Sequence, residues 1–427
     1  MRIRSGAPNL IRVRDARPRV GATPVGSPPF GWASGFSDQP RLEAAVGEAA
    51  KAVRAGLGGA APDLAVVFCS VAFAEQYGSF PGLVQKELGA KVLIGTTGMG
   101  VIGVGREVEE RPAVSISAGV LPGVTVTPFH VTADALDNLG PSPKRWGEFL
   151  RPAPSQDAHF LLFGHPFTMP VEELVNDLDQ AYPSGRKVGG LASGGRTPDT
   201  VAIFLGDQVH YEGAVGAALW GDLDFDVIVA QGCRPVGPLL KVTKASGPNI
   251  FEVDGEPAYG RLMAVLNSLS EADRLLARRS LFVGVVAREL ESVSQVQYDG
   301  GYLVRNIMGA DPKAGVVRVG HEFHDGQSIR LQVRDAATAE TEMTRMLAEY
   351  RAKVPGLDRA GAFMFQCNGR GSNLFGAEGH DARVFREGLG DVPLSGFFCN
   401  GEIGPVGEVT YLHGYTSSIG ILRPKAR

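Results

Sequence analysis

Near its end the chain reads Leu394-Ser-Gly-Phe-Phe-Cys-Asn-Gly-Glu-Ile-Gly-Pro-Val-Gly407. The stretch begins with a run of large apolar residues, which is typical of a buried strand, and then places Glu402 between glycines. Glycine allows a sharp turn and a close approach of the backbone to another group. A charged side chain in such a turn, at the end of a buried strand, predicts a small-molecule site.

A unit with this kind of ending occurs three times: an apolar strand, a helix, and a second strand that enters a glycine-rich turn. The paired strands lie at 64–69 and 91–98, at 160–163 and 187–195, and at 360–367 and 392–401. Short apolar runs separated by a helix predict buried parallel strands joined by crossovers. In such units the binding loops gather at the carboxyl ends of the strands.

Other segments alternate in polarity and predict antiparallel pairs. Residues 113–121 and 124–131 read as neighbouring strands across Pro122-Gly123, and 201–205 and 213–220 as a pair with Gly206-Asp207 in the turn. Asp335 is a good N-cap for a long helix. The combination predicts an α+β or mixed α/β fold, with two packed domains whose mixed sheets are flanked by helices.

Length and composition set the domain organisation. With 427 residues the chain is too long for one typical core, and Arg234-Pro-Val-Gly-Pro238 interrupts the pattern. We therefore expect an Arg- and Pro-rich disordered tail over 1–33, an N-terminal domain over 34–235 and a C-terminal domain over 236–427.

Charge and hydropathy exclude several classes of partner. The net charge is −4 and the basic residues are dispersed, so we expect no nucleic acid partner. No run approaches the ~18 apolar residues of a membrane span. The 4 cysteines are widely spaced without a Cys-x-x-Cys pair, which favours free thiols in a reducing, cytoplasmic compartment.

The strongest candidate site is Glu402 together with Cys399 and Asn400. In a ligand site, Glu402 would accept hydrogen bonds from an amine or hydroxyl, while Asn400 offers a donor and an acceptor. The alternative is a structural turn in which the glutamate caps backbone amides. The sequence leaves both interpretations open.

A second Cys-Asn-Gly sequence, Cys367-Asn368-Gly369, ends the preceding strand of the same unit and continues into Arg370. If the two strands are adjacent and parallel, the two turns lie side by side. Arg370 would then pair with an anionic group such as a ligand carboxylate. The alternative is a solvent-facing arginine.

The remaining candidates carry weaker signals. Thr96 and Thr97 lie in a glycine-rich turn that either lines a pocket or is structural. A nucleophilic Cys367 or Cys399 needs a nearby base or cation, and no sequence argument places a histidine there. We predict inert thiols and no catalytic residue. The spacing of the histidines predicts no metal site, and no cofactor is expected.

The chain resembles the FIST (F-box and intracellular signal transduction) family. Residues 396–405, with the Gly-Glu-Ile-Gly motif, and 411–416 resemble its C-terminal signature. Residues 305–311 and 326–335 resemble the FIST C-terminal domain, and 92–98 the N-terminal domain. The resemblance covers about residues 36–423 and does not extend to an F-box. It implies a two-part sensory module that binds small ligands such as amino acids.

The leading hypothesis is therefore a cytoplasmic small-ligand sensor that signals to an unknown partner protein. The predicted ligand is an amino acid or a related metabolite, held near Cys367–Arg370 and Asn400–Glu402. An enzyme with a cysteine nucleophile and a protein-interaction scaffold are the alternatives.

Overall fold

The structure is a computed structural model that describes residues 29–287, 301–354 and 356–425. Residues 1–28 of the predicted disordered tail lie outside these ranges. Residues 31–33 belong to the first strand, β1 (Gly31–Ser37), rather than to the tail. Within the described ranges, no helix is long and apolar enough to cross a membrane.

The predicted unit occurs three times, and each copy has further strands on either side. The first copy comprises β1, α1 (Leu42–Gly56), β2 (Leu64–Ser70), α2 (Phe80–Leu88), β3 (Val92–Gly98), β4 (Gly100–Gly103), β5 (Arg106–Glu109) and β6 (Val114–Val120). The second comprises β7 (Val124–Val131), α3 (Ala133–Leu139), α4 (Pro143–Phe149), β8 (His159–Gly164), α5 (Val171–Ala181), β9 (Lys187–Leu191), β10 (Ile203–Leu205), β11 (Gln208–His210) and β12 (Ala214–Gly221). The third comprises β13 (Leu223–Gln231), α8 (Ala336–Lys353), β20 (Gly361–Cys367), α9 (Ser372–Phe375), α10 (His380–Leu389), β21 (Leu394–Cys399), β22 (Glu402–Val406), β23 (Val409–His413) and β24 (Thr416–Pro424).

The three copies build three six-stranded sheets with the same strand order. The orders are β1-β6-β2-β3-β10-β11, β7-β12-β8-β9-β22-β23 and β13-β24-β20-β21-β4-β5. The central pairs β2–β3, β8–β9 and β20–β21 are parallel, which confirms the prediction from the repeated unit. The hairpin at the end of each sheet comes from a different copy, so the copies interlock in a cycle. We call this assembly of three sheets the body.

The hairpin exchange overturns two predicted pairings. Strand β6 lies in the first sheet and β7 in the second, so the two do not pair across Pro122-Gly123. Strand β10 pairs with β11 around Gly206, whereas β12 pairs with β7 and β8. A turn signal predicts that the chain reverses, but it does not determine which sheet receives the next strand.

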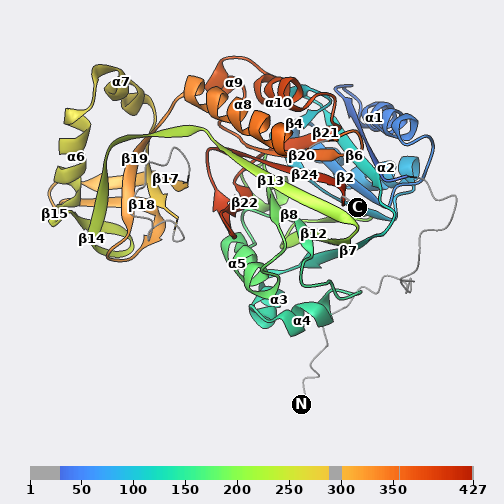
Figure 1. The fold of residues 1–427 in the computed structure, drawn as a ribbon, viewed down its shortest axis with the longest axis horizontal. Helices are drawn as coiled ribbons and strands as arrows, with labels where there is room; N and C mark the ends of the chain where they lie inside the picture. Colours follow the sequence, from blue (N-terminus) through green and yellow to red (C-terminus); the bar gives the residue numbers. More distant parts are fainter. Residues whose placement is uncertain (1–28, 288–300, 355, 426–427) are drawn as a thin grey trace, which may run out of the picture.

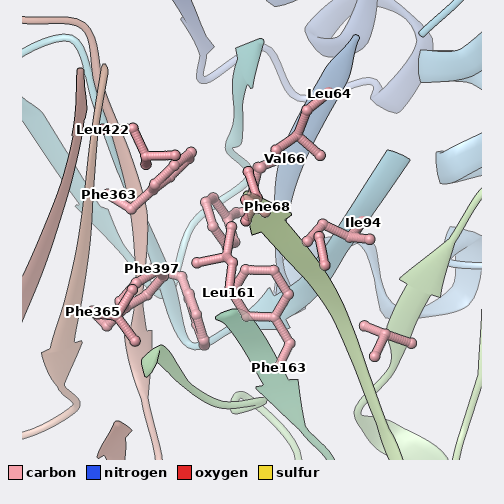
Figure 2. Close-up of a cluster of buried hydrophobic side chains, with 14 of the residues drawn as sticks. Leu64, Val66, Phe68, Ile94, Leu161, Phe163, Phe363, Phe365, Phe397 and Leu422 are labelled. Atoms are coloured by element: carbon pink, nitrogen blue, oxygen red, sulfur yellow. The ribbon is translucent and has the colours of Figure 1, made fainter. Parts of the chain in front are cut away.

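The centre of the body repeats the same residue type three times. Phe68, Phe163 and Phe365 occupy equivalent positions on β2, β8 and β20, and their ring centroids lie 5.5, 5.9 and 6.3 Å apart. Figure 2 shows these rings meeting one another and Phe397. Edge-to-face aromatic pairs of this kind contribute about 0.5–1.5 kcal/mol beyond their burial.

Next to each of these phenylalanines, a glycine of the parallel partner strand lets the two backbones approach. A Cβ on Gly95, Gly189 or Gly396 would lie 2.0, 1.8 or 1.9 Å from the carbonyl oxygen of the facing residue. No other residue type fits without moving the strands. The same constraint at three equivalent positions supports the reading of the body as a threefold internal repeat.

The helices cover the outer faces of the sheets (Figure 1). Helices α1 and α2 pack on the first sheet, α3 to α5 on the second, and α8 and α10 on the third. The Asp335 side chain accepts a hydrogen bond from the Thr338 amide, so Asp335 is the N-cap of α8, as predicted.

A second, smaller unit is inserted into the third copy, between β13 and α8. It comprises β14 (Cys233–Val253), β15 (Glu256–Pro257), α6 (Ala258–Ser268), α7 (Glu271–Arg279), β16 (Leu281–Val286), β17 (Tyr302–Asp311), β18 (Val316–Phe323) and β19 (Ser328–Arg334). The strand order is β15-β14-β18-β17-β16-β19, and an additional β14–β19 pairing closes it. We call this unit the barrel; it lies beside the body in Figure 1.

The segment from Arg234 to Pro238 was predicted to interrupt the secondary structure, and this prediction is wrong. It lies inside β14, and the register with β19 shifts between Val236 and Leu240. An irregularity of this kind tolerates proline, which cannot donate to the ladder.

Candidate functional site

The two Cys-Asn-Gly turns lie side by side at the carboxyl ends of β20 and β21. Cys367 and Cys399 are register partners in the parallel pair. The Asn368 amide donates to the Cys399 carbonyl at 3.1 Å, and Asn368 Nδ2 donates to Asn400 Oδ1 at 2.7 Å. The geometry that the sequence argument required is therefore present.

Glu402 begins β22 directly after the second turn, and its side chain is fully buried. Its Oε2 accepts hydrogen bonds from the amide and the hydroxyl of Thr416, at 3.1 and 2.8 Å. Its Oε1 has no hydrogen-bond partner among the residues that the structure describes. Burial raises the pKa of Glu402 to about 8, against the opposing effect of the Thr416 hydrogen bonds and of two arginines. One oxygen thus stabilises the turn, while the other has an unused lone pair.

Arg370 is fully buried and already has a carboxylate partner. Its guanidinium pairs with Asp381 on α10, at 2.6 Å from Nε and 3.1 Å from Nη2. Its Nη1 donates to the Gln231 carbonyl at 3.3 Å. The carboxylate that the sequence assigned to a ligand is therefore Asp381 of the chain itself. Arg370 fastens the first turn to α10 and to the end of β13.

A second arginine, Arg334, lies against Gly369 of the same turn. A Cβ on Gly369 would lie 2.2 Å from its Nη1, so only glycine leaves room for the guanidinium. The guanidinium carbon lies 5.1 Å from the ring centroid of Tyr415, which is a cation–π geometry. Its Nε and Nη2 are buried, and within residues 29–287, 301–354 and 356–425 they have no hydrogen-bond partner. The sequence analysis did not identify Arg334, which is the last residue of an alternating strand.

Further polar atoms without a hydrogen-bond partner lie on the strands that meet here. They are Asn368 Oδ1, both polar atoms of the Gln366 side chain, Ser417 Oγ, His413 Nδ1 and Tyr302 Oη. More than about 90% of buried polar groups in proteins have a partner, and each one without a partner costs about 1–3 kcal/mol. These atoms are available to a polar molecule or to ordered water.

The thiols at the site are protonated at neutral pH. Burial, and secondarily the Glu402 carboxylate, raises the pKa of Cys367 to about 11. Burial likewise raises the pKa of Cys399 well above its ordinary value. A nucleophilic cysteine requires a shift in the opposite direction. The site therefore lacks the electrostatics of a thiolate nucleophile.

The hydroxyls of Thr96 and Thr97 donate hydrogen bonds to main-chain carbonyls between β9 and β10. Thr96 Oγ1 donates to the Ala202 carbonyl at 3.1 Å, and Thr97 Oγ1 donates to the Ser193 carbonyl at 3.3 Å. Both threonines are fully buried, on β3, and their partners lie between β9 and β10. Their contacts hold these segments together and leave no hydroxyl directed to the turns around Glu402.

Two further features lie outside this group of residues. In the described ranges, no group of three or more His, Cys, Asp or Glu side chains is arranged to hold a metal ion. A surface hollow of about 480 Å³ lies between α8 and α10, and none of the predicted site residues lines it.

Comparison with known protein families covers most of the chain. The FIST N domain model matches residues 63–256 and the FIST C domain model matches residues 258–405. The chain belongs to the FIST family. No F-box domain is detected in it. The two FIST domains are interleaved in space, because β4 and β5 complete the third sheet and β22 and β23 complete the second.

Several known proteins are similar in sequence to this chain. An uncharacterized protein of Mycobacterium tuberculosis (strain H37Rv) is 34% identical over 387 residues, which cover 91% of this chain and 98% of the relative. An uncharacterized protein of Mycobacterium bovis is 34% identical over 390 residues, covering 91% and 97%. Human F-box only protein 22 is 42% identical over 172 residues, covering 39% of this chain and 37% of that protein. FIST domains are associated in general with signal transduction and ligand sensing.

Proposed function

We propose that this FIST protein is a sensor that binds an amino acid or a related metabolite at the two Cys-Asn-Gly turns. One observation carries the proposal: in the described part of the chain, the buried Glu402 Oε1 lacks a hydrogen-bond partner, and the site also holds polar donors without partners there. A buried carboxylate oxygen of this kind matches an ammonium or hydroxyl donor. In the ligand-bound protein, the ligand would form hydrogen bonds with the polar atoms that otherwise lack partners and destabilise the fold.

The setting of the proposed sensor is a reducing compartment, with the cytoplasm as the proposed location. The four cysteines are free thiols, and disulfides form and persist in oxidising compartments instead. A signalling role further requires a partner protein that distinguishes the occupied from the empty state. The chemistry of the site does not identify that partner.

A thermal-shift screen with L-amino acids and related metabolites tests the proposal. Ligand at about a hundredfold excess over its Kd stabilises a protein by about 2.7 kcal/mol, so the unfolding midpoint should rise by several degrees. Glu402→Gln keeps the shape of the side chain and removes its charge, so the shift for an ammonium ligand should largely disappear. Glu387→Gln, at an exposed position on α10, is the matched control and should retain it. The proposal fails if no compound raises the midpoint, or if Glu402→Gln retains the full shift.

A further inference from the structure

The chain passes between the body and the barrel at one place beside the proposed site, which we call the root. The described chain leaves the body between Gln231 and Cys233 and returns between Arg334 and Asp335. Cys233 and Arg334 are register partners at the start of the β14–β19 pairing. Arg370 of the body holds this root through the Gln231 carbonyl. Away from the root, Arg305 of the barrel donates to the Leu412 carbonyl of the body at 3.0 Å and pairs with Glu172 at 3.2 Å, so a rotation about the root also has to break these contacts.

The two ionisable side chains of the site, Glu402 and Arg334, belong to the two different units. Glu402 lies on β22 of the body, whereas Arg334 is the last residue of β19 of the barrel. No salt bridge joins Arg334 to a carboxylate in the part of the chain that the structure describes. A molecule that contacts both groups would tie the barrel to the body.

Tyr415 makes a separate contact between the units. It has a φ of +69°, which costs a non-glycine residue about 1–3 kcal/mol and is commonly found at functional sites. Its ring centroid lies 4.2 Å from that of Phe282 on β16, and its hydroxyl donates to Asn306 on β17. The next residue, Thr416, holds Glu402 Oε2. Tyr415 thus connects the turn that positions Glu402 to the barrel.

The site is closed in this arrangement. Glu402 is 0% exposed and Cys399 is 1% exposed, and Cys367 is only partly exposed. A ligand can reach the Glu402 carboxylate only if part of this packing opens. The Tyr415 ring lies between the turn that positions Glu402 and the barrel residues Phe282, Asn306 and Arg334, so separating these contacts would open a path from the barrel side.

We propose that Arg334 is the anion-binding residue of the site, and that the barrel turns about its Cys233–Arg334 root to admit a ligand that then bridges Arg334 and Glu402. The ligand class is a small molecule that carries both a cationic donor and an anionic group. Ligand binding thereby changes the orientation of the barrel relative to the body, and a partner protein can bind one of the two orientations. This inference rests on the proposed function and adds the second contact residue and the moving unit.

The first test needs no ligand and measures access to the site. Asn306→Ala removes the hydrogen bond to Tyr415 from the barrel side, outside the proposed binding residues. Loss of one hydrogen bond of about 0.5–1.5 kcal/mol should increase the open population about two- to tenfold. Alkylation of Cys367 by iodoacetamide, followed by peptide mass spectrometry, should accelerate by the same factor. Met308→Ala, at an exposed position on the same strand, is the control and should react at the wild-type rate. Equal rates of Cys367 alkylation in the two variants would overturn the proposal that the barrel turns about its root.

The second test measures the bridge with a mixture of the standard L-amino acids as the probe. The mixture should raise the unfolding midpoint of the wild type and leave that of Arg334→Met nearly unchanged. If both proteins are stabilised equally, the assignment of Arg334 is wrong and the proposed function stands. If the wild type is not stabilised either, the amino-acid proposal itself fails, and the bridge fails with it. The two failures are therefore distinguishable.

Discussion

Two arginines contact the same turn and differ in what surrounds them. Arg370 is fully buried, pairs with Asp381 through two hydrogen bonds, and donates from its third nitrogen to a carbonyl. Arg334 is half-buried, and its Nε and Nη2 have no hydrogen-bond partner among the residues that the structure describes. The first arrangement is what a folding chain needs from a buried cation. The second arginine makes a cation–π contact with Tyr415, and its two remaining donors are the ones that we propose bind an anionic group of a ligand.

The largest loss of unfolding free energy should come from breaking the Arg370–Asp381 ion pair. Asp381→Asn leaves the buried Arg370 cation without a carboxylate, which typically costs about 3–5 kcal/mol of unfolding free energy. Urea denaturation measures the loss. Glu387→Gln removes an exposed carboxylate of the same helix that pairs with Arg383, and it should cost at most about 1 kcal/mol. Similar losses in the two variants would show that the Arg370 pair is not a structural element.

Glu402 should give stability an unusual dependence on pH. Burial raises its pKa from 4.5 to about 8, so between these values the folded protein holds a proton that the unfolded chain has lost. Stability from this group is present below the unfolded pKa and falls as pH rises toward 8, by at most about 1.4 kcal/mol per pH unit.

Glu107 should change the stability with pH in the same direction, because burial and the nearby Asp381 charge raise its pKa to about 7. The difference between the wild type and Glu402→Gln therefore isolates Glu402. In urea titrations from pH 5 to 8 (roughly the window between the two pKa values of Glu402), the variant should gain stability relative to the wild type as pH rises. Parallel curves would contradict the burial of an ionisable Glu402.

The smallest change in unfolding free energy should come from substituting Arg334. Arg334→Met keeps the apolar stem and removes donors that have no partner, so the unfolding free energy of the unliganded protein should change by less than about 1 kcal/mol. Arg370→Met should instead destabilise by several kcal/mol, because it leaves the buried Asp381 unpaired. If the two variants lose equal stability, the contrast between a structural and a binding arginine does not hold.

The sequence predicted what local patterns can determine. Apolar runs, helices and glycine turns identified the three units and their parallel strand pairs, since these depend on neighbouring residues. The exchange of hairpins was not predictable, because β4, β10 and β22 choose partners in other copies. Within the site, the adjacency of Cys367 and Cys399 followed from the repeat. Asp381 and Arg334 were missed because a carboxylate on an amphipathic helix and an arginine on an alternating strand both look solvent-facing. Only the fold brings Arg334 against Gly369 and Asp381 against Arg370.

The most direct test of the central claim is a crystal structure of the protein as purified, examined at the space between Glu402 and Arg334. The account predicts a bound small molecule within hydrogen-bonding distance of Glu402 Oε1 and of Arg334 Nε or Nη2. The contradictory result is a direct Arg334–Glu402 ion pair, or ordered water alone that satisfies both groups. Either outcome would make the pair a structural element and remove the binding site.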